Sequence, residues 1–458
     1  MTAWLRRATR GSLWHHGDFR KVWLGETVSQ LGGQVTYLAF PLAGALLLHA
    51  TPTEMGLLGA FGLLPYLVIS LPAGGWIDRV RRRPVLVASA LTIALSLLVV
   101  PLAYVAGFLS MPLLYLVALV TGTGGLVYDM AAQAYLPTLI DREQLVEGNS
   151  KLELSRSAAQ VVGPGLGGAL VALITAPLAI LVDSIALLFT TAMLLFVRTP
   201  EPAPRRADRR PGLWREIREG LHLVFRNPIL LSIAATMATY FFFDSMAQAV
   251  YILYVTRDLG LGAGEIGLIL ALGNLGFLPG ALLAGRIGRR LGVGPTLILS
   301  IGVCSVFGLL APLAVPGFAF PMLVLSRLGV AFGLPVFMIN QISLRQSITP
   351  DRLLGRLTGT MKFVAIGVAP IGAFVGGALG SGIGVHASLA LSALGAMTAV
   401  TWLVLSPVRR LRAAPAPWRE DQALAIAAEA GAEAAPETHR APVELRSQGR
   451  AKTDSAVP

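Results

Sequence analysis

Runs of apolar residues, each about the length of a membrane-spanning helix, recur along the whole chain and alternate with short polar segments. A helix needs about 20 apolar residues to cross a bilayer, and the runs have that length. They are too long and too uniformly apolar for the alternating strands of a membrane barrel. The pattern predicts an all-α membrane protein with twelve transmembrane helices, at residues 22–48, 54–77, 84–107, 112–135, 149–174, 177–198, 228–256, 264–285, 294–314, 319–343, 355–380 and 385–407.

The polar segments between these runs alternate in charge. Every second connection is rich in arginine, whereas the others hold no Lys or Arg, with Arg257 as the one exception. Because cytoplasmic loops carry the excess of basic residues, the arginine-rich connections are predicted to lie in the cytoplasm. Both termini fall on that side, so the chain is expected to be a multi-pass protein of the inner (plasma) membrane with both ends cytoplasmic.

The runs divide into two groups of six. A proline-rich and basic segment separates the groups, and an Ala-, Pro- and Glu-rich stretch with few large apolar residues follows the last run. Such a stretch cannot bury enough surface to fold. The predicted organisation is a cytoplasmic N-terminal segment (1–21), a first six-helix bundle (22–198), a cytoplasmic linker (199–227), a second six-helix bundle (228–408) and a disordered cytoplasmic tail (409–458).

The two halves also repeat each other in sequence. The basic turn at 79–83 coincides with the basic turn at 286–290 at an offset of 207 (286 − 79 = 207), and Pro164 coincides with Pro370 at an offset of 206 (370 − 164 = 206). An embedded cation precedes each proline by eight residues. A repeat of this kind predicts two structurally similar bundles.

The composition supports a membrane protein and excludes several other classes. The 458 residues are 54% hydrophobic and 14% charged, with a mean hydropathy of +0.68, which lies outside the range of soluble domains. The net charge of +12 reflects topological arginines and not nucleic-acid binding. The only cysteine, Cys304, allows neither an intramolecular disulfide nor a cysteine metal cluster. We therefore expect no metal site, no cofactor and no enzymatic activity.

The turn after the second run carries a specific pattern. It reads Gly74-Gly75-Trp76-Ile77-Asp78-Arg79-Val80-Arg81-Arg82-Arg83, and it resembles the signature between the second and third helices of the major facilitator superfamily, with Arg81 where the family usually has glycine. The resemblance implies a charge relay that latches the two halves together. The alternatives are a static ion pair or a plain cytoplasmic anchor. The implied gating residues are Gly74, Asp78, Arg79, Arg82 and Asp129.

Other segments resemble the exporter branch that contains the enterobactin and macrolide efflux proteins. They are the run at 19–25, the segment at 29–32 and the residues before the fifth helix, at 136–142; the chain departs from that branch at Gly33, where an acid is common. A Gly-Pro run in the fifth helix resembles the helix-bend motif of exporters, although ordinary small-residue packing would explain it equally well. The motif residues, with the matching proline of the second half, are Gly163, Pro164, Gly167 and Pro370.

Ionisable side chains inside membrane helices are costly and therefore mark functional candidates. A carboxylate in a low-dielectric cavity can exchange a proton for a substrate, and Glu26 is expected to pair with Arg156. The alternatives are that Glu26 and Asp244 lie in interfacial water, and that the cations only neutralise cavity acids. An anionic substrate would instead favour these cations. The proton-coupling candidates are Glu26, Asp244, Arg156, Arg327 and Lys362.

Polar and aromatic residues on the helices that line the cavity of this family complete the candidate site. They could hold a substrate by hydrogen bonds or stacking, while polar packing between helices is the alternative. The substrate-cavity candidates are Gln30, Gln34, Tyr37, Tyr240, Phe243, Gln248, Asn340 and Gln341.

Together, the pattern and the resemblance predict a secondary transporter that exports a drug, a macrolide-like compound or a siderophore by proton antiport and alternating access. The chain has no Gly-x-x-x-x-Gly-Lys-Ser phosphate loop, so ATP is not the expected energy source. The expected partners are a small molecule, protons and the lipid bilayer, with no nucleic acid and with a monomeric protein. Uptake or lipid flipping on the same fold, or a non-transporting sensor, remain alternatives.

Overall fold

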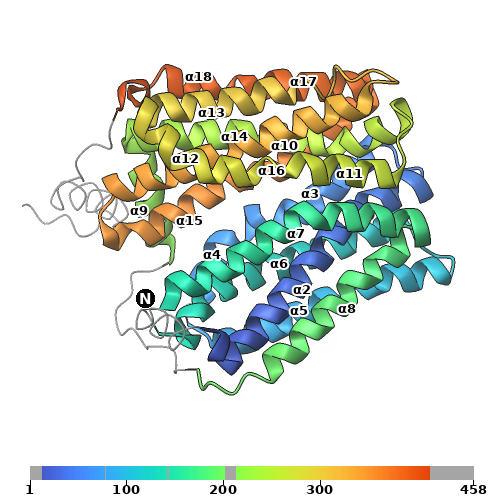
Figure 1. Ribbon diagram of the computed structural model, residues 1–458, viewed down its shortest axis with the longest axis horizontal. Helices are drawn as coiled ribbons and strands as arrows, with labels where there is room; N and C mark the ends of the chain where they lie inside the picture. Colours follow the sequence, from blue (N-terminus) through green and yellow to red (C-terminus); the bar gives the residue numbers. More distant parts are fainter. Residues whose placement is uncertain (1–12, 78, 142–143, 202–212, 413–458) are drawn as a thin grey trace, which may run out of the picture.

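The computed structural model describes residues 13–77, 79–141, 144–201 and 213–412. Within these ranges the chain forms helices and turns only, and no strand. Asp78 and nearly all of the predicted C-terminal tail lie outside the described residues. Figure 1 shows two helical bundles, one built from the first half of the chain and one from the second.

The N-terminal bundle follows the six predicted runs. A short 3-10 turn, η1 (Leu13–His15), precedes it, and its first buried residue, Leu13, packs beside Phe19. The bundle consists of α2 (Gly17–Leu42) with the π-helical turn η2 (Ala43–Leu47), α3 (Pro52–Val68), α4 (Ser70–Ile77), α5 (Arg82–Val105), α6 (Met111–Leu139), α7 (Leu145–Ile174) and α8 (Ala176–Leu195).

The C-terminal bundle repeats this order. It ends in a short 3-10 turn, η5 (Pro407–Arg410), whose neighbour Leu411 accepts a hydrogen bond from the backbone N–H of Gly294. The bundle consists of α10 (Pro228–Leu253) with the π-helical turn η4 (Tyr254–Asp258), α11 (Ala263–Asn274), α12 (Phe277–Leu291), α13 (Val293–Gly308), α14 (Ala319–Ile348), α15 (Asp351–Gly367), α16 (Ala369–Ile383), α17 (Val385–Met397) and α18 (Ala399–Val404).

The twelve predicted spans are confirmed, although three of them do not meet the length and hydropathy of a spanning helix. Among the described residues, nine helices are long and apolar enough to cross a membrane. The other three spans are α2, which carries several charged residues in its first turns, the broken pair α3 and α4, and the shorter α13. Each of these three still occupies its place in the bundle between neighbours that do span (Figure 1).

The repeat predicted from the sequence is present, but the structure revises its offset. The π-helical turns η2 and η4 are 211 residues apart (254 − 43 = 211), and so are Glu54 and Glu265. Each of these glutamates accepts a hydrogen bond from the backbone N–H that starts its helix, at 2.7 and 2.8 Å. Further along, Thr175 and Gly384 occupy equivalent turns at an offset of 209 (384 − 175 = 209). The offsets of 206 and 207 therefore aligned similar residues and not structurally equivalent ones.

The linker contains a helix that the sequence analysis missed. Helix α9 (Leu213–Arg226) is amphipathic, and its buried residues Leu223 and Val224 belong to a hydrophobic cluster of the C-terminal bundle. Glu219 of α9 forms an ion pair with Arg356 of α15. The linker helix is thus docked on the C-terminal bundle (Figure 1).

The start of the linker is fixed to the N-terminal bundle instead. Asp18 accepts hydrogen bonds from the backbone N–H groups of Arg198 and Thr199, at 2.9 and 2.8 Å. Glu201 accepts from the backbone N–H of Arg82 at 2.6 Å and of Arg83 at 3.0 Å, where α5 begins. A carboxylate at a helix N-terminus satisfies amides that have no partner within the helix.

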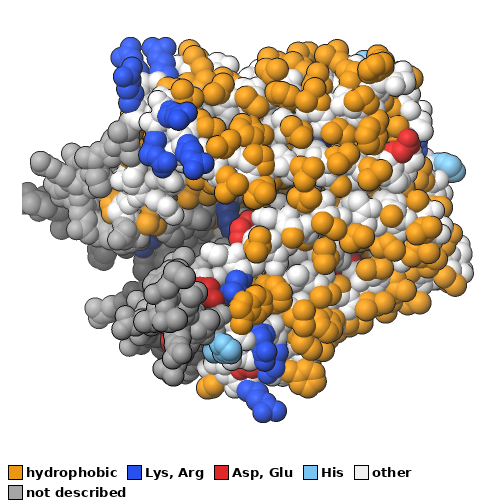
Figure 2. Space-filling model, viewed as in Figure 1, with side chains coloured by type: hydrophobic (Ala, Val, Ile, Leu, Met, Phe, Trp, Pro, Cys, Tyr) orange, Lys and Arg blue, Asp and Glu red, His pale blue; other side chains and the backbone are white. Residues whose placement is uncertain are grey.

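The two bundles differ in how closely they meet at their two ends. We call the end that carries α9 and the basic turns the arginine-rich end, and the end with the loops around His49, Gly107 and Gly384 the opposite end. On the face shown in Figure 2, nearly all Lys and Arg side chains lie at the arginine-rich end. Two glycine contacts close the opposite end, α3 against α16 and α7 against α11: a Cβ on Gly377 would lie 2.6 Å from the Cα of Gly56, and one on Gly168 would lie 2.8 Å from that of Gly267.

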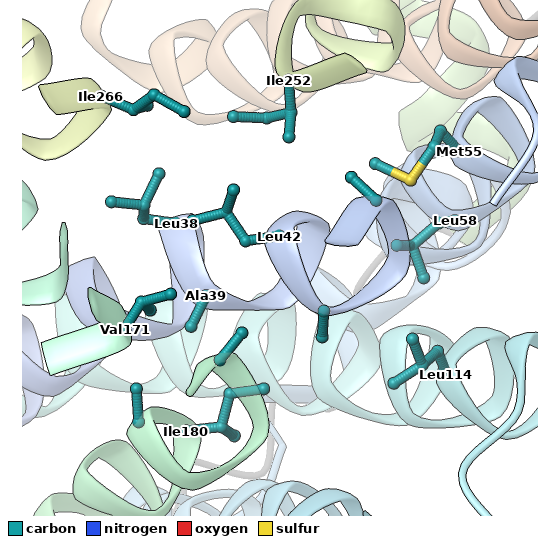
Figure 3. Close-up of a cluster of buried hydrophobic side chains, with 14 of the residues drawn as sticks. Leu38, Ala39, Leu42, Met55, Leu58, Leu114, Val171, Ile180, Ile252 and Ile266 are labelled. Atoms are coloured by element: carbon teal, nitrogen blue, oxygen red, sulfur yellow. The ribbon is translucent and has the colours of Figure 1, made fainter. Parts of the chain in front are cut away.

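An apolar cluster continues this closure between the bundles. Leu38 and Leu42 of α2 are almost completely buried and belong to the same cluster as Ile252 of α10 and Ile266 of α11. Figure 3 shows these leucines facing the two isoleucines across the interface. Arg257, the basic residue that broke the charge alternation, donates to the carbonyl oxygens at the end of the first span and so adds a polar contact between the bundles.

Candidate functional site

Many of the predicted site residues fall into two groups. One group surrounds Glu26 toward the arginine-rich end of the N-terminal bundle, and we call it the Glu26 cluster. The other lines a cavity of about 90 Å³ within the C-terminal bundle, which we call the C-bundle pocket.

In the Glu26 cluster, the carboxylate of Glu26 is held by two polar neighbours. Its Oε1 accepts from Nε2 of Gln30 at 2.8 Å, one turn along the same helix, and its Oε2 accepts from the hydroxyl of Tyr128 on α6 at 2.9 Å. The expected pair with Arg156 is not among the ion pairs formed by the described residues. The helices that carry Glu26 and Arg156 are nevertheless neighbours, as expected, because Thr27 donates to Ser155 at 2.9 Å.

Asp129 extends this cluster to the C-terminal bundle. Its carboxylate lies within electrostatic reach of Glu26, of Arg156 on α7 and of Lys362 on α15. The side chains of Asp129, Arg156 and Lys362 are exposed, although they belong to three helices of the membrane domain. Figure 2 shows acidic and basic side chains in the hollow between the two bundles at the arginine-rich end. Charged side chains of both bundles therefore face the hollow between the bundles at the arginine-rich end.

The C-bundle pocket is built on one face of α10. Tyr240, Asp244, Gln248 and Tyr251 recur at helical spacing and all line the cavity, together with Phe243. Side chains three or four residues apart lie on the same side of a helix. The remaining wall comes from α13, α14 and α17, so the pocket lies inside the C-terminal bundle and not between the bundles.

Arg327 of α14 is the only base among the lining residues of this pocket, and Asp244 is the only acid. The guanidinium carbon of Arg327 lies 6.0 Å from the centre of the Tyr251 ring, within the range of a cation–π contact. Tyr37 of α2, which is 52% exposed, lies within electrostatic reach of Arg327 and Tyr251.

One residue of the predicted gating turn, Arg82, has a partner in the linker. Arg82 lies with its Nη1 3.8 Å from Oε1 of Glu201, the linker residue that also caps α5. Asp78 lies outside the described residues, as do the side-chain surroundings of Gly74, and Arg79 is exposed. The latch between Asp78, Arg82 and Asp129 stays a prediction.

Several cavity candidates take part in helix packing. Nδ2 of Asn340 donates to the carbonyls of Ala284 and Val336, at 3.2 and 2.8 Å, which ties α14 to α12. Gln341 is also buried, and its Oε1 has no hydrogen-bond partner among the described residues. Neither residue lines the C-bundle pocket.

The helix-bend motif likewise serves close packing. A Cβ on Gly163 would lie 2.4 Å from the Cβ of Gln34, and one on Gly167 would lie 3.1 Å from the Cα of Val35, so both glycines bring α7 against α2. Pro370 follows a break between α15 and α16, whereas Pro164 lies inside the unbroken helix α7. The two prolines therefore do not interrupt their spans in the same way.

The structure adds functional candidates that the sequence analysis did not select. They are Tyr128 beside Glu26, Tyr251 and Cys304 in the C-bundle pocket, and Glu201 at the basic turn. Tyr251 follows Asp244 by seven residues, so its helical spacing was a usable signal. Glu201 and Tyr128 are joined to their partners only by tertiary contacts, which leave no local pattern.

Comparison with known proteins agrees with this fold. The family profile of the Major Facilitator Superfamily matches residues 22–250 and 234–446. The multidrug efflux pump Tap of Mycolicibacterium fortuitum is 28% identical over 401 residues, covering 84% of this chain and 95% of Tap. The enterobactin exporter EntS of Escherichia coli O1:K1 / APEC is 26% identical over 412 residues, covering 87% of this chain and 94% of EntS.

A solved structure shares the same architecture. The crystal structure of a bacterial homologue of the iron transporter ferroportin, in an inward-facing state, superposes with a TM-score of 0.66 at 19% identity, covering 86% of this chain and 99% of the homologue. The match to the family profile covers nearly the whole membrane domain and agrees with the two six-helix bundles, which leads to one assignment. The chain is a multi-pass membrane protein that belongs to the Major Facilitator Superfamily of transporters.

Proposed function

We propose that this protein exports a small molecule across the plasma membrane by alternating access and that proton entry drives the export. The names of its relatives Tap and EntS, a multidrug efflux pump and an enterobactin exporter, support export. We place the arginine-rich end, and with it both termini, in the cytoplasm because basic loops are retained on that side. In this orientation the structure is closed to the outside and receives its substrate from the cytoplasm.

One observation carries the proposal: the two bundles are sealed at one end and present opposite charges to each other at the other end. The seal consists of the glycine contacts and the apolar cluster around Leu38. The charges are Asp129, Arg156 and Lys362. A transporter that alternates must exchange these two arrangements, and the charges can form the complementary closure when the cytoplasmic end shuts.

Glu26 is the proposed proton carrier. It is a membrane-embedded carboxylate near the other charged groups, and its hydrogen bonds to Gln30 and Tyr128 hold it in place. A proton that neutralises Glu26 would change the electrostatic balance around Asp129, which lies within its reach. Proton entry would thereby be coupled to the separation or approach of the bundles. The monomeric state stays a prediction.

Transport in inside-out membrane vesicles tests the proposal, with erythromycin and enterobactin as probes of two substrate classes. We expect accumulation of one probe when the vesicle lumen is acidified, and a loss of accumulation when an ionophore removes the gradient. Equal accumulation with and without the gradient would exclude proton coupling. Failure of both probes to accumulate would exclude export of these two classes.

A matched pair of variants tests the role of Glu26. Glu26→Gln is expected to lower gradient-driven accumulation at least about tenfold, because the amide cannot carry the proton. Glu153→Gln is the control, since Glu153 is an exposed glutamate of the neighbouring helix α7. If Glu26→Gln transports as well as Glu153→Gln, the assignment of Glu26 is wrong.

A further inference from the structure

The C-bundle pocket is separate from the charges that meet between the bundles. Its walls come from α10, α13, α14 and α17. The lining is largely apolar and aromatic, with small hydroxyl residues such as Ser305 and Ser326. A concave apolar site with few polar groups is the usual form of a small-molecule site.

Arg327 is the unusual member of this pocket. Its Nε is buried and has no hydrogen-bond partner among the described residues. Nearly all buried donors in proteins are paired, and an unpaired guanidinium donor inside a membrane domain is costly. The position calls for an acceptor that is not part of the described protein.

The acid in the same pocket does not supply that acceptor. Asp244 and Arg327 interact electrostatically, but no ion pair within 4.0 Å joins them in the described chain. No other Asp or Glu lines the cavity. A negatively charged group could therefore enter between these side chains and bind Arg327.

The backbone around Arg327 holds this side chain in position. Gly273 of α11 packs so closely that a Cβ there would lie 2.3 Å from the Cβ of Arg327. The first carbon of the side chain is thus fixed by a helix contact, while the guanidinium lies beside the ring of Tyr251 at 6.0 Å from its centre.

We propose that the C-bundle pocket binds an aromatic anion, whose acidic group accepts hydrogen bonds from Arg327 and whose ring lies against Tyr251. The inference rests on the proposed export function and names its substrate class. The guanidinium presents a planar fork of donors that matches a carboxylate. An organic cation would instead meet the positive charge of Arg327 on entering the pocket.

Binding to the purified full-length protein in detergent tests this class directly. The probes share one ring system and differ in charge: 2-naphthoate, neutral 2-naphthamide and cationic 2-naphthylmethylammonium, each titrated by calorimetry. We expect 2-naphthoate to bind at least about tenfold more tightly than the amide, since hydrogen bonds to charged groups are the stronger ones. We expect the ammonium compound to bind most weakly.

Two substitutions of Arg327 test whether its guanidinium binds the carboxylate of 2-naphthoate. Arg327→Gln is expected to weaken 2-naphthoate at least about tenfold and 2-naphthamide by less than about threefold. Arg327→Lys keeps the charge but loses the planar fork, so its affinity for 2-naphthoate should lie between those of the wild type and Arg327→Gln. Arg289→Gln, at an exposed arginine of α12, is the matched control and should change neither affinity.

Two results would overturn the inference. One is tightest binding of the ammonium compound with its loss in Asp244→Asn, which would make this a cation pocket. The other is unchanged 2-naphthoate binding in both Arg327 variants. Should Arg327→Gln fail to fold, Arg327→Lys and Asp244→Asn decide between the classes, because replacement of the acid should preserve or strengthen anion binding.

The outcome is independent of the transport experiment. Selective 2-naphthoate binding without probe accumulation in vesicles would exclude export of the two probe classes and leave the anion site. Gradient-driven export by a protein that does not distinguish 2-naphthoate from 2-naphthamide would retain the export function and remove the anion site.

Discussion

In the N-terminal bundle three intramembrane charges, Glu26, Asp129 and Arg156, lie near one another toward the arginine-rich end. In the C-terminal bundle the corresponding charges, Asp244 and Arg327, face a pocket inside the bundle. The helices repeat, with equivalent caps and turns, but the charges do not. Under the two proposals made above, the duplicated scaffold separates two tasks, with proton exchange in one bundle and substrate binding in the other.

The largest effect is expected from the seal at the opposite end. Because the helices of the two bundles repeat, its two glycine contacts should be equally important. The substitutions are Gly168→Leu in one bundle and Gly377→Leu in the other. Even a Cβ alone would lie 2.6 Å from a carbonyl oxygen at Gly168 and 2.5 Å from one at Gly377, so a leucine cannot fit without displacing the neighbouring helix. Such overpacking costs about 1–3 kcal/mol, enough to shift the population away from the closed opposite end. Both variants should lower probe accumulation in vesicles at least about tenfold.

Cross-linking reports the conformation directly. The hydroxyls of Thr53 and Ser381 lie 2.7 Å apart across the seal, so a T53C/S381C pair in a Cys304→Ser background should cross-link readily and lose this cross-link in either glycine variant. Gly302→Leu is the control, because nothing lies within 4 Å of its Cβ position. A clear difference between Gly168→Leu and Gly377→Leu would show that the seal is not symmetric.

A smaller effect is expected from the two linker anchors, one on each bundle. Glu219 is buried and pairs with the partly exposed Arg356, so Glu219→Gln removes the charge from the buried end of this pair and should cost about 1–2 kcal/mol. Glu201→Gln keeps a capping oxygen for α5 and should cost about 1 kcal/mol or less. Apparent unfolding temperatures in detergent should fall further for Glu219→Gln; the reverse order would mean that the linker depends mainly on the N-terminal bundle.

The smallest effect concerns two equivalent turns. Thr175 and Gly384 have nearly the same backbone angles, with φ of 82° and 94°, a region that β-branched residues rarely adopt. The Thr175 hydroxyl is also buried without a hydrogen-bond partner among the described residues. Thr175→Gly should therefore stabilise the protein by about 1 kcal/mol, and Gly384→Thr should destabilise it by about the same amount. Shifts of the same sign in thermal unfolding would contradict the equivalence.

The sequence was sufficient for the helices but not for their junctions. Apolar runs fix the spans because each must cover the bilayer thickness, and even α2, with its charged first turns, was found in this way. The runs did not reveal that α3 and α4 are separate, or that α9 forms within the linker. Both depend on packing: α9 is stable where Leu223 and Val224 enter a cluster supplied by other helices.

The candidate site was predictable only where a residue was conspicuous by itself. Asp244 and Arg327 stand out as charges in apolar runs, and both line the same pocket. Asn340 was equally conspicuous, yet its side-chain amide donates hydrogen bonds to backbone carbonyls of α12 and α14. The sequence shows that a polar residue in a membrane helix needs a hydrogen-bond partner. Only the tertiary structure shows whether the side chain bonds to a backbone group or faces a cavity where a ligand could bind.

Cys304 lines the pocket that contains Asp244 and Arg327, and it carries the only thiol of the 458 residues. Mass spectrometry of the unaltered protein can therefore assign any alkylated or oxidised thiol to one wall of this pocket. A small fluorinated tag on that sulfur would give a single resonance whose frequency follows the occupancy of the pocket.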